Sequence, residues 1–72
     1  MKGTITNIPL DDEGRRKGFG FIRGDDGADY FFHATDLSKI SRRFIELSTG
    51  EIAEFTPADG KRGKDRAADV IA

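Results

Sequence analysis

The chain has 72 residues with twelve basic and thirteen acidic side chains, so its net charge is −1 with the histidine neutral. This length predicts one domain, over residues 1–72, with a small core, because a domain of this size buries only about 60% of its unfolded surface. The lack of cysteine excludes disulfides and thiolate metal sites, and with one histidine we expect no metal and no cofactor. No long apolar run or leader is visible, so we expect a cytoplasmic protein without membrane contact.

Five short segments are predicted to be β-strands, because glycine, proline and polar residues separate them. The expected strands span residues 4–8, 18–23, 29–33, 51–56 and 66–71. Turns are expected at residues 24–27 and, rich in glycine, at residues 57–63. This pattern predicts an all-β fold, a five-stranded antiparallel barrel.

The connection over residues 36–47 is long for a chain of this size. Asp36 or Ser38 would cap a helical turn there, and Ile40, Phe44 and Leu47 follow at near-helical spacing. We therefore expect a long loop or a helical turn between the third and fourth strands.

One face of the strands should supply the core. The predicted interior residues are Ile5, Ile22, Tyr30, Phe32, Leu37, Ala53, Phe55 and Val70. If Tyr30 is buried, its hydroxyl needs a hydrogen-bond partner.

The opposite face of the second and third strands is aromatic. With a period of two, Lys17, Phe19 and Phe21 share one side of the second strand. Phe31 and His33 share one side of the third. Rings beside cations form a platform on which unpaired bases can stack, so this face predicts binding of single-stranded nucleic acid.

Phe19 stands between Gly18 and Gly20, which we interpret as the surroundings of a ligand-facing ring, since glycine weakens a strand unless something approaches closely. The alternative is that a phenylalanine-rich hairpin is simply core. His33 considered alone is more typical of a structural residue, and its place two residues after Phe31 makes it a stacking candidate.

The charge balance argues against a partner held by bulk electrostatics. The basic residues nevertheless gather near the aromatic segments, at Arg15, Arg16, Lys17, Arg23, Arg42, Arg43, Lys61, Arg62, Lys64 and Arg66. Each charge run is also typical of a solvated loop. We expect weak binding that depends on stacking more than on counterion release.

Together these segments resemble the cold-shock domain family, small OB-fold barrels that bind single-stranded RNA and DNA. Residues 17–22, Lys-Gly-Phe-Gly-Phe-Ile, are similar to the family's first ribonucleoprotein motif, and residues 29–33 are similar to its second. The resemblance implies nucleic-acid-binding roles for Lys17, Phe19, Phe21, Asp29, Phe31, His33 and Phe44, with Arg62 as a looser match. Arg15 and Arg16 join them because they directly precede Lys17.

Three features depart from the family's pattern. Asn7 stands where the family has an exposed tryptophan, and Ala34 follows the histidine where an aromatic residue is usual. The loop before Lys17 is also several residues longer. Each lost ring would weaken binding by roughly 1–3 kcal/mol.

We expect a monomeric binder of single-stranded RNA or DNA, similar to cold-shock RNA chaperones, and not an enzyme. The glycines lack the spacing of a phosphate-binding loop, and the carboxylates have no evident catalytic partner, so no catalytic residue is assigned. The alternative is a barrel of this family with weak nucleic-acid affinity that acts as a protein-interaction or accessory module. The missing tryptophan, Ala34 and the acidic balance favour that alternative.

Overall fold

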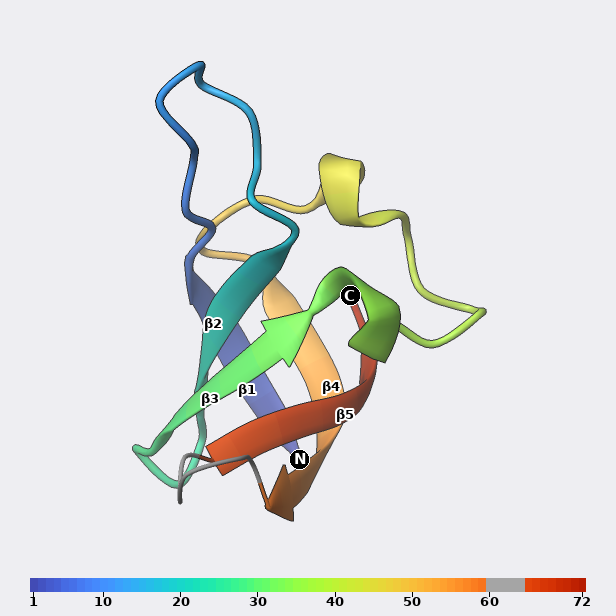
Figure 1. Cartoon of the computed structure of the whole chain (residues 1–72). Coiled ribbons are helices and arrows are strands. Elements are labelled where there is room, and N and C mark those ends of the chain that lie inside the picture. Colours follow the sequence, from blue (N-terminus) through green and yellow to red (C-terminus); the bar gives the residue numbers. More distant parts are fainter. Residues whose placement is uncertain (60–64) are drawn as a thin grey trace.

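Five strands close into a barrel in the order β1-β2-β3-β5-β4 (Figure 1). The computed structural model describes residues 1–59 and 65–72. The strands are β1 (Lys2–Asn7), β2 (Phe19–Gly24), β3 (Asp29–His33), β4 (Ile52–Asp59) and β5 (Asp65–Ile71). Each of the five described strands therefore pairs with a neighbour on both sides, an arrangement without the open sheet edge that promotes aggregation. The predicted all-β barrel is confirmed, and its closure agrees with an OB-fold.

The expectation of a purely antiparallel barrel is wrong for one pair of strands. β3 and β5 run parallel, with Phe31 beside Arg66, whereas β1/β2, β2/β3, β1/β4 and β4/β5 are antiparallel. The physical reason is the route of the chain. The long connection crosses one end of the barrel from β3 to β4, so β5 returns beside β3 in the same direction.

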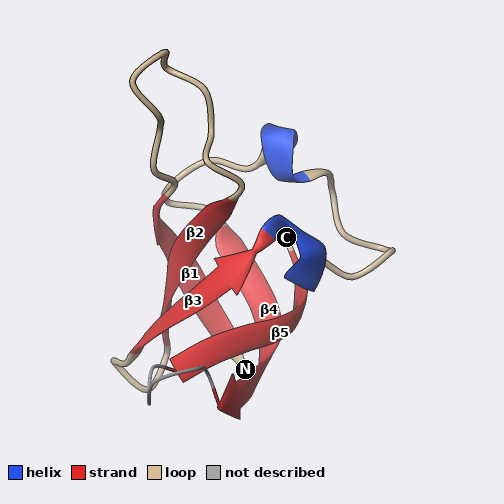
Figure 2. Ribbon diagram, viewed as in Figure 1, coloured by secondary structure: helices blue, strands red, loops and turns tan. Residues whose placement is uncertain are grey.

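That connection is a long loop with two separate 3-10 turns, η1 (Ala34–Asp36) and η2 (Phe44–Glu46), which agrees with the expected long loop or helical turn (Figure 2). Ile40, one of the residues at helical spacing, is 78% exposed, so no continuous apolar stripe forms. No helix in the described part of the chain is long and apolar enough to span a membrane.

β4 extends further than expected, because Pro57 belongs to the strand and not to the following turn. Pro57 pairs with Ala67, and Ala58 pairs with Arg66. Proline has a backbone angle compatible with an extended strand and is tolerated where its missing N–H is not needed by a neighbour.

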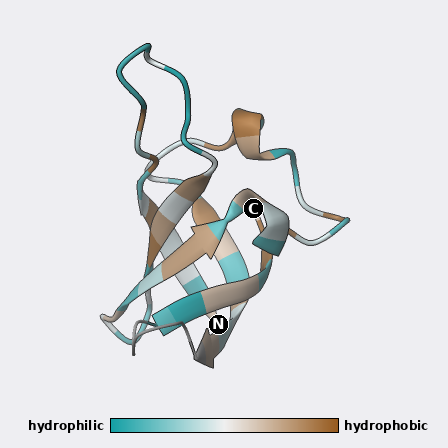
Figure 3. Ribbon diagram, viewed as in Figure 1, coloured by the Kyte–Doolittle hydropathy of each residue, from teal (hydrophilic) through white to brown (hydrophobic). Residues whose placement is uncertain are grey.

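The core lies inside the barrel and consists of Ile5, Ile22, Tyr30, Phe32, Leu47, Ala53, Phe55, Ala67 and Val70. All predicted core residues except Leu37 are buried. Leu37 packs against the core but remains partly exposed at the end of η1. Leu47 and Ala67 were not predicted, because Leu47 lies outside every strand and alanine carries little signal of burial. Figure 3 shows that the loop between β1 and β2 is largely hydrophilic.

Gly20 is required by this core. A Cβ at Gly20 would lie 2.9 Å from Cε1 of the Phe32 ring and 3.0 Å from the carbonyl oxygen of Asn7. The glycine therefore makes room for Phe32 inside the barrel, which corrects the interpretation that it serves ligand access at Phe19.

Tyr30 finds the hydrogen-bond partner that its burial requires. Its Oη donates to Oδ2 of Asp26 at 2.6 Å, and Oδ1 of Asp26 accepts the backbone N–H of Ala28 at 3.0 Å. The Tyr30 ring packs on Phe55 with centroids 4.9 Å apart. The bond to Asp26, followed by burial, raises the pKa of Tyr30 to about 12, and the same bond lowers the pKa of Asp26.

We expect an alkaline absorbance titration of the single tyrosine to have its midpoint near pH 12 and not near the ordinary value of 10.0. The folded pKa lies above the unfolded one. The stability that the Tyr30 proton contributes is therefore present below pH 10 and is lost as the pH rises through about 12. Because the hydrogen bond from Tyr30 lowers the pKa of Asp26, the stability that the Asp26 carboxylate contributes is present at neutral pH. It is lost as the pH falls through that lowered pKa and the carboxylate is protonated. The matched variant Asp26→Asn should bring the Tyr30 midpoint down towards 10, and a wild-type midpoint already at 10 would contradict this assignment.

Candidate functional site

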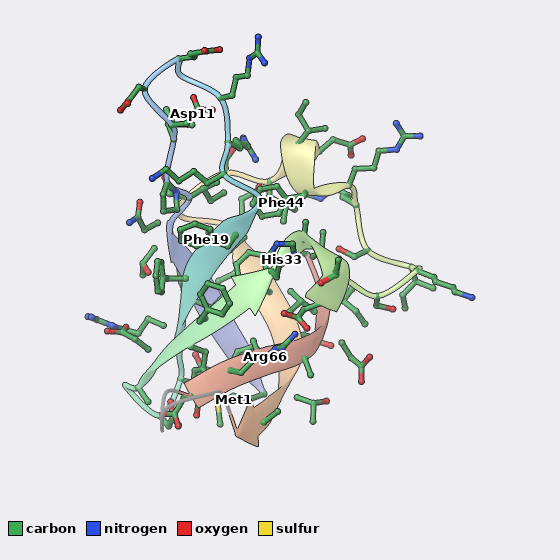
Figure 4. All side chains as sticks on the ribbon, in the orientation of Figure 1. Met1, Asp11, Phe19, His33, Phe44 and Arg66 are labelled. Atoms are coloured by element: carbon green, nitrogen blue, oxygen red, sulfur yellow. The ribbon has the colours of Figure 1, made fainter. Side chains whose placement is uncertain are left out.

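Three phenylalanine rings form a cluster on the outside of the β2/β3 hairpin. The ring centroids are 5.5 Å apart for Phe19 and Phe31, and 5.9 Å apart both for Phe19 and Phe21 and for Phe21 and Phe31. Cross-strand pairing places Phe21 beside Phe31 and Phe19 beside His33. The three rings are half-buried and His33 is exposed, so the structure brings together the four predicted stacking residues. We call these four residues the aromatic face (Figure 4).

His33 is anchored at the edge of this face by the turn that follows it. Its Nδ1 accepts the backbone N–H of Thr35 at 3.2 Å. Its own backbone N–H is donated to Oδ2 of Asp36 at 2.8 Å, which completes a capping box for η1. Nε2 of the ring lies beside Gly18, which has a φ of +86°. The cap thus holds the imidazole next to Phe19 and leaves it open to solvent.

An open groove of about 430 Å³ adjoins the aromatic face, lined by Thr6, Asn7, Phe21, Arg23, Asp29, Phe31 and Asp65. Asn7, the residue expected at the position of the family's tryptophan, pairs with Phe21 across β1 and β2 and so lies beside the rings. Asp29, a predicted binding residue, is exposed and forms an ion pair with Arg23, Nε to Oδ1, at 3.0 Å. This carboxylate raises the pKa of Arg23. The groove therefore combines ring surface with amide and charged groups.

Phe44, to which the resemblance gives a binding role, is the first residue of η2. Its ring is half-buried against the core residue Phe32, with centroids 5.9 Å apart. Arg16 covers it, with the guanidinium carbon 5.9 Å from the ring centroid, and Nη1 donates to the Phe44 carbonyl oxygen at 2.6 Å. Arg16 and Phe44 thus join the two long loops, and the Arg16 guanidinium already has a partner.

The other predicted cations differ in their surroundings. Arg15 lies 3.6 Å from Glu13, between Nη2 and Oε2, in an ion pair whose arginine side chain is 79% exposed. Oδ1 of Asp11 orders this loop by accepting the N–H groups of Glu13 and Arg15. Lys17 is exposed just before β2. Arg62 lies outside the described residues.

Sequence reasoning did not select Asp36 or Arg66 for the site. Arg66 reaches the aromatic face only because β5 runs parallel to β3. No signal in the sequence gave the pairing of β5 with β3. In the structure Ala67 is buried, and alternation along the strand therefore directs the Arg66 side chain outward. Among the described residues, no three carboxylate or imidazole groups gather as a metal site requires.

Comparison with known proteins agrees with this arrangement. A family model described as the 'Cold-shock' DNA-binding domain matches residues 12–72. Cold shock-like protein CspG of Escherichia coli K12 is 43% identical over 56 residues, which cover 76% of this chain and 76% of that protein. Cold shock-like protein CspC of Bacillus cereus is 40% identical over 55 residues, which cover 76% of this chain and 80% of that protein. Glycine-rich protein 2 of Nicotiana sylvestris is 43% identical over 56 residues, and this chain spans 25% of its length. The chain belongs to the cold-shock domain family.

Proposed function

We propose that this chain binds single-stranded RNA or DNA by stacking bases on the aromatic face. The observation that carries the proposal is that Phe19, Phe21 and Phe31 lie together outside the barrel, in contact with one another and only half-buried. Half-exposed rings in contact with one another suit a flat ligand, because each base offers a face of similar shape.

In this mechanism, bases stack on Phe19, Phe31 and His33, and Phe21 extends the surface. Lys17 is exposed two residues before the start of β2 and would neutralise a phosphate. Asp29 lines the adjoining groove and would accept a hydrogen bond from a base amino group. Every base has a flat aromatic face that can stack on a ring, so the protein would have low sequence preference.

A monomer of this kind acts as an RNA chaperone without catalysis. It binds unpaired strands and not duplexes, so it shifts the pairing equilibrium towards open RNA in proportion to its free concentration. No covalent step and no ATP are needed.

The direct test is a fluorescence anisotropy titration with a labelled oligopyrimidine, as RNA and as DNA, with a duplex of the same length as control. We expect saturable binding to both single strands and much weaker binding to the duplex. A chain that binds neither single strand would contradict the proposal and favour the accessory-module alternative.

Phe31 and its neighbour Phe32 provide a matched pair of substitutions. We expect Phe31→Ala to weaken single-strand binding by about 1–3 kcal/mol with a smaller loss of folding stability, because its ring is outside the barrel. Phe32 is completely buried, so Phe32→Ala should lower the free energy of unfolding by about 3–5 kcal/mol. Urea unfolding and anisotropy on both variants make the comparison.

Phe19→Ala should behave like Phe31→Ala, since the two rings contact each other. If both variants lost as much stability as Phe32→Ala while binding normally when folded, the rings would be core residues and the stacking mechanism would be wrong.

Arg15 and Arg16 are expected to contact phosphates. If each contacts one, replacing both by alanine should make the slope of log affinity against log salt shallower by about 1.4, at about 0.7 per phosphate. The two single variants measure the contribution of each arginine to the slope separately. They differ because the Arg16 guanidinium donates to the Phe44 carbonyl oxygen, whereas Arg15 forms a longer, exposed ion pair with Glu13. An unchanged slope in the double variant would mean that both arginines serve only contacts within the protein.

A further inference from the structure

Arg66 lies on β5, beside the aromatic face that β2 and β3 carry. It is the β5 residue paired with Phe31, so its side chain leaves the sheet on the same side as the Phe31 ring. The next residue, Ala67, is buried inside the barrel, as alternation requires. Figure 4 shows Arg66 on β5, near the end of β3 that carries His33.

The carboxylate of Asp36 holds the Arg66 guanidinium in one orientation. Nη2 donates to Oδ1 at 2.6 Å and Nε donates to Oδ2 at 3.2 Å, a two-point contact that fixes the guanidinium plane. Asp36 is itself fixed, because Oδ2 also accepts the backbone N–H of His33. The guanidinium is therefore tied to the same turn that anchors the histidine ring.

This ion pair leaves the guanidinium accessible. The Arg66 side chain is 39% exposed, whereas that of Asp36 is 10% exposed. Guanidinium groups stack on flat rings, and unpaired bases are bound in this way by arginine. Because Asp36 compensates its charge, Arg66 offers a flat surface more than an attraction for phosphate.

We propose that Arg66 is a further stacking position for a nucleobase, next to Phe31 and His33, and that Asp36 is its positioning residue. This rests on the proposed binding of single strands. The guanidinium would supply flat surface beside η1, where Ala34 carries no ring.

Arg66→Lys is the most informative substitution, because it keeps the charge and removes the plane. We expect about three- to tenfold weaker binding of the labelled oligopyrimidine. A guanidinium that merely contacted phosphate would be replaced by an ammonium group without loss, so wild-type affinity in this variant would overturn the proposal.

Arg42→Lys is the matched control. Arg42 forms an equally short ion pair, 2.6 Å from Nη2 to Oε2 of Glu51, between the long connection and the start of β4. β4 pairs with β1 and β5 and not with the hairpin that carries the rings. We expect this variant to bind like the wild type, and a loss equal to that of Arg66→Lys would overturn the assignment to Arg66.

Asp36→Asn tests the positioning role. Without its carboxylate partner, Arg66 should stack less well but carry a free charge. Affinity at high salt should fall, and the slope of log affinity against log salt should steepen by about 0.7. Weaker binding with an unchanged slope would show a merely structural role for Asp36 and overturn its assignment.

Urea unfolding of each variant ensures that folded protein is compared. Failure of the wild type to bind any single strand would overturn the proposed function itself. A wild type that binds, is weakened by Phe31→Ala and is unaffected by Arg66→Lys would overturn only the role of Arg66.

Discussion

The register between β2 and β3 is the constraint on which the rest of the structure depends. Because side chains alternate along a strand, the pairing of Phe21 with Phe31 places both rings outside, and the pairing of Gly20 with Phe32 places that ring inside. A slip of one residue would exchange the two sets and bury the aromatic face. The small size of Gly20 opposes such a slip, since the position opposite Phe32 has no room for a larger residue. The same hairpin thus supplies both the core and the candidate binding surface.

The two ends of this hairpin are held by different interactions. At the turn between β2 and β3, Asp26 accepts hydrogen bonds from Tyr30 and Ala28, which joins a core ring to the loop. At the other end, Asp36 accepts from the backbone of His33 and from Arg66, which joins β3 to β5. In both places a carboxylate, Asp26 or Asp36, accepts hydrogen bonds at its two oxygens, so neither end of the hairpin contains an unpaired buried charge.

Much of this arrangement follows from the sequence, because period-two alternation is a local property. It predicts Phe32 inside the barrel and Phe31 outside, and the glycines at both ends of residues 24–27 predict the turn between β2 and β3. What the sequence did not indicate depends on the path of the long connection. The parallel contact of β3 with β5 follows from that path. The burial of Leu47 and the contact of the Arg16 guanidinium with the Phe44 ring arise in or beside the connection itself. Apolar spacing there suggested a helical turn, and Phe44 does begin one that Leu47 caps, but Ile40 is exposed and lies outside it.

The arrangement of charge also explains how an acidic chain can have a nucleic-acid-binding surface. Arg23 and Arg66 flank the rings, yet each is paired with a carboxylate, Asp29 and Asp36 respectively. Paired cations at the rim hold their positions, so in the proposed mechanism they would orient a base and release few counterions, without strong, salt-dependent affinity for phosphate. In the proposed mechanism, stacking would supply most of the binding free energy and would limit binding to strands whose bases are unpaired. A basic surface would also attract duplexes, whose phosphates carry the same charge, so a low net charge would favour the proposed distinction between single and paired strands.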